Sequence, residues 1–167
     1  MLLIEKKALP DAVATEQLVL LFEHRCKTRL RTRIESGEEV GIFLERGTVL
    51  RGGDLLQTND GRIVEVMAAL EAVMEAYSDN PLALVRAAYH LGNRHVAVQL
   101  ETGMLRFAKD HVLGEMVSGL GLDVVESLAP FEPESGAYGG HGGHGHSADG
   151  EGRGARIHDM MLKQRAP

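Results

Sequence analysis

The sequence contains a single cysteine, Cys26, no tryptophan and few aromatic residues of any kind. One cysteine cannot form a disulfide within the chain, and it cannot supply the group of thiolates that holds a structural zinc ion. Because aromatic residues make up only 4% of the composition, the core must be built from Leu, Val, Ile, Met and Ala. No apolar run reaches the roughly 18 residues of a membrane-spanning helix, so we expect no membrane partner.

Positive charge is also in short supply. Lys and Arg number 18 against 24 Asp and Glu, which gives a formal net charge of −6. Proteins that bind nucleic acids present a basic face, so this balance argues against a nucleic-acid partner. The one basic run, HRCKTRLRTR (24–33), alternates as the exposed face of a strand does. The N-terminus, MLLIEKKALP, places its charges after its apolar residues, the wrong order for a signal peptide, so we expect a cytoplasmic protein.

The first part of the chain has the pattern of short strands separated by glycine turns. KTRLRTRI (27–34) alternates with period two, EEVGIFLE (38–45) follows an ESG turn, and RIVEV (62–66) follows Asp-Gly. Several short strands with glycine turns are typical of a small barrel or sandwich. We therefore expect a β-rich domain over residues 1–70.

Residues 71–134 mix helical and strand patterns. Asn80 is a good N-cap, Pro81 suits the first helical position, and Gly92 lies where a left-handed C-terminal residue is expected. HVAVQL (95–100) and MLRFA (104–108) predict a hairpin, Asp110 caps a second helix, and LDVVESLAPF (122–131) predicts a last strand. Residues 72–77 could form a strand or a helix. A strand there completes the βαββαβ order of a ferredoxin-like domain, in an α+β protein.

From residue 135 to residue 167 the composition differs sharply from that of the preceding chain. Residues 136–154 contain nine glycines and almost no apolar side chains, so we expect a disordered Gly/His tail. His141, His144 and His146 lie in this glycine background, a composition typical of metal binding. Imidazole is a suitable ligand for Zn(II), Cu(II) and Ni(II). The alternative is a low-complexity tail with no role.

Three other histidines have positions that allow metal binding but do not require it. His90 falls in the last turn of the first predicted helix, where the helix dipole favours a cation. His95 lies at the entrance of a strand, and His111 opens the second helix, where the dipole favours the neutral imidazole that binds metals. Each has an ordinary surface role as its alternative. The sequence has no catalytic triad, phosphate-binding loop or zinc-protease pattern, which favours a binding or carrier protein over an enzyme.

Three segments together resemble the UreE family of urease accessory proteins, the nickel metallochaperones of urease maturation. They are RGTVLRGGDLL (46–56), HLGNRH (90–95) and FEPESGAY (131–138), the last followed by the histidine-rich tail. The resemblance covers nearly the whole chain in the same order. It implies a peptide-binding-like N-terminal domain and a ferredoxin-like C-terminal domain that begins with residues 72–77 as a strand.

The resemblance also implies a site and its partners. The protein would be a homodimer joined through its C-terminal domains, with His95 of both chains near the two-fold axis binding one Ni(II). Tail histidines would complete the shell, and the partners would be the urease accessory GTPase and apo-urease. Some members carry a histidine two positions before the one matching His111. Here that residue is Lys109, which weakens the expectation of an auxiliary site.

We therefore expect a non-enzymatic homodimer that delivers Ni(II) to apo-urease. Two rival hypotheses are a protein-binding adaptor of the maturation complex and a protein that buffers zinc, copper or nickel, since imidazole ligands do not by themselves select one metal. The candidate metal ligands are His95, His141, His144, His146, His111 and His90.

Overall fold

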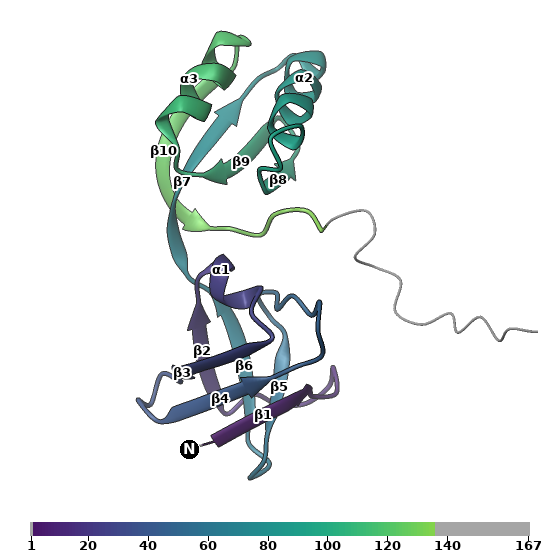
Figure 1. Cartoon of the computed structure of the whole chain (residues 1–167), viewed down its shortest axis with the longest axis vertical. Coiled ribbons are helices and arrows are strands. Elements are labelled where there is room, and N and C mark those ends of the chain that lie inside the picture. Colours follow the sequence, from purple (N-terminus) through teal and green to yellow (C-terminus); the bar gives the residue numbers. More distant parts are fainter. Residues whose placement is uncertain (1, 136–167) are drawn as a thin grey trace, which may run out of the picture.

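The computed structural model describes residues 2–135, which form two domains, each built on its own sheet (Figure 1). The N-terminal domain has a six-stranded sheet in the order β2-β6-β5-β1-β4-β3. The Glu35 amide donates to the Gln17 carbonyl at 2.9 Å, which links the two outer strands and nearly closes the sheet into a barrel. Its elements are β1 (Leu2–Lys7), β2 (Glu16–Leu20), α1 (Phe22–Arg25), β3 (Arg29–Arg33), β4 (Glu39–Phe43), β5 (Leu55–Thr58) and β6 (Ile63–Ala68).

The core of this domain follows the period of two that the sequence predicts. Alternate residues of the strands point inward, such as Val40 and Ile42 of β4 and Val64 and Val66 of β6, and all four are fully buried. Each buried aliphatic side chain contributes about 1.5–3 kcal/mol of hydrophobic free energy relative to exposure. Along β3 the arginines alternate outward, which confirms an exposed basic strand face over Arg29–Arg33.

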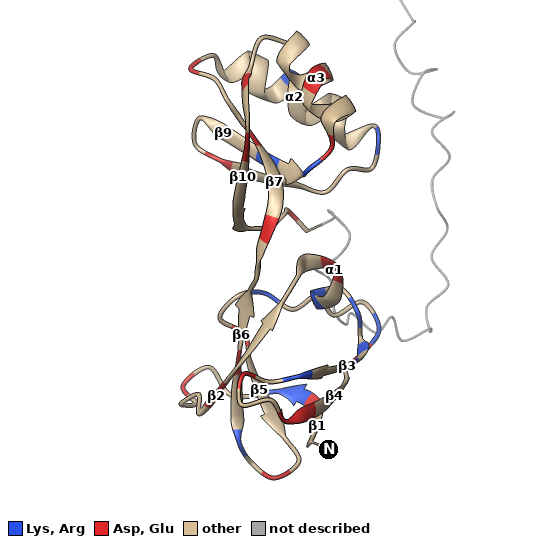
Figure 2. Ribbon diagram, turned by 90° about the vertical axis from the view of Figure 1, so that its left-hand side faces the viewer, with Lys and Arg blue, Asp and Glu red and all other residues tan. Residues whose placement is uncertain are grey.

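The C-terminal domain has the ferredoxin-like arrangement. Its four-stranded sheet runs β10-β7-β9-β8 and is antiparallel throughout, with α2 and α3 on one face (Figure 2). Residues 72–77 lie within strand β7, as the resemblance implies. Pairing with β9 on one side and β10 on the other outweighs the helix propensity of Ala, Glu and Met there. Its elements are β7 (Leu70–Tyr77), α2 (Pro81–Gly92), β8 (Val98–Glu101), β9 (Met104–Ala108), α3 (His111–Gly119) and β10 (Asp123–Pro130).

Small residues let both helices lie close to the sheet. Helix α2 buries Ala83, Ala87 and Leu91. A Cβ added to Gly114 in α3 would come within 2.5 Å of the Met74 methyl group of β7, so glycine permits this approach. No helix within residues 2–135 is long and apolar enough to cross a membrane. The predicted Gly/His tail lies, apart from its first residue, outside the described residues.

Candidate metal centre

Helix α2 carries one candidate ligand, His90, and a second, His95, follows three residues after its end; the start of the helix is as the sequence predicts. The Asn80 side chain accepts a hydrogen bond from the Leu82 amide at 3.0 Å, and Pro81 occupies the first helical position. This cap satisfies a backbone donor that the helix cannot satisfy internally. The N-terminus of α2 is thus determined locally, by its own few residues.

The C-terminus of α2 differs from the prediction, and the difference falls on His95. Gly92 is the last helical residue and does not have positive φ, so the predicted left-handed glycine is wrong. His95 takes that role with φ 55°, and it is the one non-glycine with positive φ among residues 2–135. The His95 amide donates to the Gly92 carbonyl at 2.9 Å and the Val96 amide to the Leu91 carbonyl at 3.1 Å. These two bonds are those of a Schellman motif, with His95 at its C′ position.

Glycine is the usual residue at C′, because any side chain there crowds its own backbone at a cost of about 1 kcal/mol. Histidine tolerates this region better than most residues but still pays part of that cost. The His95 side chain is exposed. A strained residue that presents a metal-binding side chain to solvent is the kind of feature that points to a role beyond folding.

His90 lies in the last turn of α2, as predicted, and is half-buried. Its ring packs edge-on against Tyr89, with ring centroids 5.4 Å apart and planes at 77°. Its carbonyl accepts a hydrogen bond from the Arg94 guanidinium at 3.0 Å. Both histidines therefore belong to the same helix end, but residues 2–135 contain no group of three or more His, Cys, Asp or Glu able to surround one metal ion.

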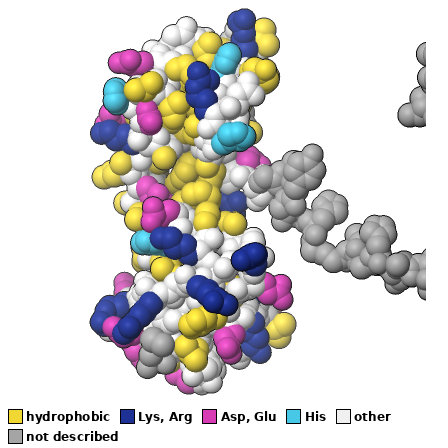
Figure 3. Space-filling view, in the orientation of Figure 1, with side chains coloured by type: hydrophobic (Ala, Val, Ile, Leu, Met, Phe, Trp, Pro, Cys, Tyr) yellow, Lys and Arg dark blue, Asp and Glu magenta, His cyan; other side chains and the backbone are white. Residues whose placement is uncertain are grey.

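An apolar stripe runs along the outer side of the same helix. Leu82, Val85 and Tyr89 follow at helical spacing and are 62%, 63% and 65% exposed. Figure 3 shows exposed hydrophobic side chains, in yellow, on the surface of the C-terminal domain. Helix α2 is therefore apolar on two sides, one against its own sheet and one facing outward. The outward stripe ends at Tyr89, six residues before the strained His95.

His111 lies apart from this helix end, as the first residue of α3, and is exposed. Asp110 caps the helix as predicted, accepting from the Val112 and Leu113 amides at 2.9 and 3.0 Å. Lys109 forms an ion pair with Glu126 at 2.6 Å. The structure thus gives Lys109 a surface partner of its own. The remaining candidates, His141, His144 and His146, lie outside the described residues.

One expectation for the basic run at 24–33 is wrong. Arg25 lies in α1 and not on a strand, and its side chain is fully buried. It pairs with Glu132 at 2.7 Å across 107 positions of sequence. Cys26 is exposed, although partial burial still raises the pKa of its thiol. No local pattern predicts the Arg25–Glu132 pair, apart from the presence of Glu132 in the FEPESGAY segment.

Comparisons with known proteins agree with this architecture. Residues 3–69 match the family "UreE urease accessory protein, N-terminal domain", and residues 71–160 match the corresponding C-terminal domain. The urease accessory protein UreE of Nitrosospira multiformis is 54% identical over 140 residues, covering 83% of this chain and 80% of that protein. UreE of Ectopseudomonas mendocina is 48% identical over 166 residues, covering 98% and 100%.

The fold and the helix end define the class: a two-domain accessory protein in which a barrel-like domain precedes a ferredoxin-like domain with histidines at a helix terminus. Together the two family matches cover residues 3–69 and 71–160, and each of the two relatives matches more than 80% of the chain. The chain belongs to the UreE family of urease accessory proteins.

Proposed function

We propose that this protein acts in urease maturation as a nickel carrier: it binds Ni(II) as cargo and delivers it to apo-urease while the urease metallocentre is assembled. It acts as a cytoplasmic homodimer, without catalytic activity of its own, in a complex that includes the urease accessory GTPase. The observation that carries the proposal is His95, an exposed imidazole held in a strained backbone conformation at the end of α2.

Two-fold symmetry explains how one such histidine can serve as a metal site. In an isologous dimer a residue near the axis meets its own copy, so His95 supplies two nitrogen ligands to one ion. Imidazole is a suitable ligand for Ni(II), and it also suits Zn(II) and Cu(II), which are possible alternative cargoes. His90 and His111 are the further candidates within the C-terminal domain.

The apolar stripe of Leu82, Val85 and Tyr89 supports a dimer contact beside this histidine. These side chains are more than 60% exposed in the single chain. Covering them with the same stripe of a second copy would remove apolar surface from water, and each side chain fully covered would contribute about 1.5–3 kcal/mol. If the two copies of α2 cross near their C-terminal ends, the same contact brings the two copies of His95 together.

The start of the tail supports the participation of His141, His144 and His146. The Glu134 amide donates to the Val98 carbonyl at 2.8 Å, and Val98 lies three residues after His95. Three residues span at most about 11 Å, and the six steps along the chain from residue 135 to residue 141 can span about 20 Å. A tail histidine can therefore reach the His95 site of its own chain. We divide the chain accordingly into residues 1–70, 71–134 and 135–167, the last serving as the tail.

Calorimetric titration of the metal-free protein with Ni(II), together with mass measurement of the complex, tests the proposal. We expect one tight ion per dimer in the unmodified protein and loss of that site in His95→Ala. The control is His24→Ala, which removes a histidine of the N-terminal domain that pairs only with Glu23 among the described residues. A tight site that survives in His95→Ala would overturn the proposal.

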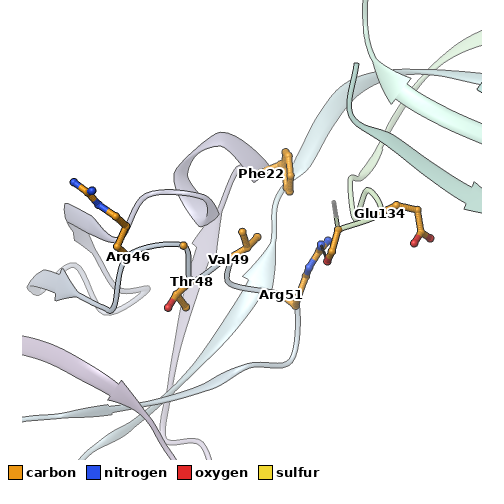
Figure 4. A pocket seen from close by; sticks show the side chains of 8 residues that line it. Phe22, Arg46, Thr48, Val49, Arg51 and Glu134 are labelled. Carbon is orange, nitrogen blue, oxygen red and sulfur yellow. Dashed lines mark hydrogen bonds between the residues drawn. The ribbon is translucent and has the colours of Figure 1, made fainter. Parts of the chain in front are cut away.

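A protein-binding adaptor is the second candidate. An open pocket of about 580 Å³ lies at the junction of the domains, lined by Phe22, Val49, Arg51 and Glu134 among others (Figure 4), and it could receive a peptide segment. Deleting residues 136–167 separates the two functions. A carrier without these residues would bind fewer nickel ions per dimer and would lose nickel transfer. An adaptor without them would keep partner binding and its effect on urease activation. A buffering protein would bind metal but would not speed urease activation.

A further inference from the structure

Residues 131–135 follow β10 and leave the C-terminal domain, yet much of their bonding is to the N-terminal domain. We call this segment the brace. One oxygen of the Glu132 carboxylate accepts from the Arg25 guanidinium at 2.7 Å and from the Gly52 amide at 2.8 Å. Arg51 donates to the second carboxylate oxygen at 3.1 Å and to the Pro133 carbonyl at 2.7 Å. The brace is therefore bound to the N-terminal domain by both side chain and backbone.

The same five residues are also hydrogen-bonded to the C-terminal domain. The Glu132 amide donates to the Gln99 side-chain oxygen at 2.8 Å, and the Glu134 amide donates to the Val98 carbonyl at 2.8 Å. Both acceptors lie on β8, the strand that follows the helix end with His95. The brace thus contacts both domains within five residues (Figure 1).

Arg25 shows how closely the two domains are joined at this point. Its side chain is fully buried, whereas the Glu132 side chain is 29% exposed. A buried guanidinium needs a partner for each of its donors. Arg25 donates to the Leu20 and Leu50 carbonyls of its own domain, and to Glu132 and the Phe131 carbonyl of the brace.

The Glu132 carboxylate is adapted to this position. Burial by itself would raise its pKa, but the hydrogen bonds from the Gly52 amide, Arg51 and Arg25 outweigh that effect and the pKa is lowered. The group therefore stays charged at neutral pH. A negative charge beside a buried arginine is held by charge-assisted hydrogen bonds, which are stronger than neutral ones.

Apolar contacts complete the junction. Phe22 of α1 and Phe131 of the brace pack edge to face, with ring centroids 5.4 Å apart. Phe131 forms a small buried cluster with Val73 of β7 and Ala129 of β10, and Phe22 packs against it. Figure 4 shows Phe22 and Arg51 beside the segment that carries Glu134. The cluster thus joins α1 to the adjacent strands β7 and β10 of the C-terminal sheet.

We propose that the brace, held by Glu132 in its site on Arg25, Arg51 and Gly52, fixes the orientation of the two domains and the point from which the tail leaves. The chain passes between the domains directly only at residue 69, and domains joined by one short link move relative to each other unless an interface holds them. Glu132 is thus a positioning residue. Its consequence for metal delivery, a tail that starts beside the His95 helix end, rests on the proposed function.

Distance measurement between two spin labels tests the brace without any metal. Cysteines replace Glu45 and Ser118, exposed residues of the N-terminal and C-terminal domains, in full-length protein carrying Cys26→Ser. Labelled chains are diluted with unlabelled ones so that pairs within one chain dominate. We expect a single narrow distance distribution, and a distribution about twofold broader in Glu132→Ala and in Glu132→Gln.

The matched control is Glu126→Gln, which removes an exposed carboxylate of β10 that pairs with Lys109. It should leave the distribution unchanged. An unchanged distribution in Glu132→Ala would overturn the proposal. Hydrogen exchange guards against general unfolding: the Gly52 and Glu134 amides should lose protection in Glu132→Ala, while those of β4 and β7 keep it. Loss of protection throughout either sheet would also overturn the proposal, since it would make Glu132 a determinant of folding and not of orientation.

Nickel titration of the same variants keeps this inference separate from the proposed function. Glu132→Ala should retain the tight site that depends on His95 but transfer nickel more slowly. A broadened distance distribution with no nickel site in any variant would support the brace and reject the carrier function. A normal nickel site with an unchanged distance distribution would support the carrier function and reject the brace.

Discussion

The left-handed conformation of His95 leads to a prediction in which two substitutions at one position have different effects on stability. His95→Gly and His95→Ala both remove the imidazole, but only glycine adopts φ near 55° without strain. We expect metal-free His95→Gly to be more stable than metal-free His95→Ala. The unmodified protein should lie between them, because histidine tolerates this region better than alanine does.

The size of the difference follows from two opposing terms. A left-handed conformation costs a residue with a Cβ about 1–2 kcal/mol. Glycine gives back about 0.4–1 kcal/mol through the greater freedom of the unfolded chain. The net advantage of glycine over alanine at position 95 is therefore about 1 kcal/mol. With a urea dependence of about 1–3 kcal/mol per M, the unfolding midpoints should differ by about 0.3–1 M.

Urea unfolding followed by tyrosine fluorescence measures this difference. Tyr77 and Tyr89, two of the three tyrosines, lie in the C-terminal domain, so the signal follows the domain that carries residue 95. Protein concentration must be equal in all samples, because dimerisation would add to the apparent stability. The control is Asn93→Gly, at φ −62° in the same turn, which should lower stability by about 0.5–1 kcal/mol.

If His95→Ala proves as stable as His95→Gly, the assignment of residue 95 to the C′ position is wrong. The same two variants also distinguish the effect of the backbone conformation at residue 95 from the effect of the imidazole on metal binding. Both should lack the tight nickel site, so a stabilised protein without nickel binding would show that histidine is kept here at the expense of stability.

Three further predictions concern single positions. Gly92→Ala should raise the free energy of unfolding by about 0.5–1 kcal/mol, because Gly92 is helical and an added Cβ meets nothing within 4 Å. A decrease of this free energy in a urea titration would show instead that Gly92 has the left-handed conformation. Asp110→Ala should lower it by about 1 kcal/mol in the same assay through loss of the α3 cap, whereas an unchanged midpoint would contradict that role. The pKa of Asp60 is lowered to about 2 by hydrogen bonds from Arg62 and Thr58, so its stabilising contribution is complete above its ordinary pKa near 4 and is lost as the pH falls through 2. A carboxyl NMR titration should give that midpoint and a higher one in Arg62→Met.

The local features of the fold were predictable because a few neighbouring residues decide each of them. Asn80 and Asp110 cap their helices through their own side chains, and Gly103 has the positive φ that the loop between β8 and β9 requires. The turn residues before EEVGIFLE and RIVEV predicted the strands that the structure has as β4 and β6. Short segments of sequence therefore determine the starts of both helices and the hairpin.

The end of α2 could not be predicted in this way. Two residues, Gly92 and His95, could take the left-handed position, and propensity favours glycine. The position of Val96 decides between the two, because Val96 packs against the core cluster that contains Leu91. With Val96 fixed there as the residue after the motif, the left-handed position falls on His95. The strained histidine thus depends on packing in three dimensions.

By itself the sequence determined the α+β class, the order of the two domains, the starts of α2 and α3 and the family, since caps and turns act over a few residues and the family segments lie in fixed order. Tertiary structure alone decided the conformation of His95 and the burial of Arg25. Arg25 and Glu132 are 107 positions apart, and no local pattern distinguishes Arg25 from the exposed arginines of β3. Only the folded chain brings the two charges together, because a buried guanidinium is stable where hydrogen-bond acceptors from both domains surround it.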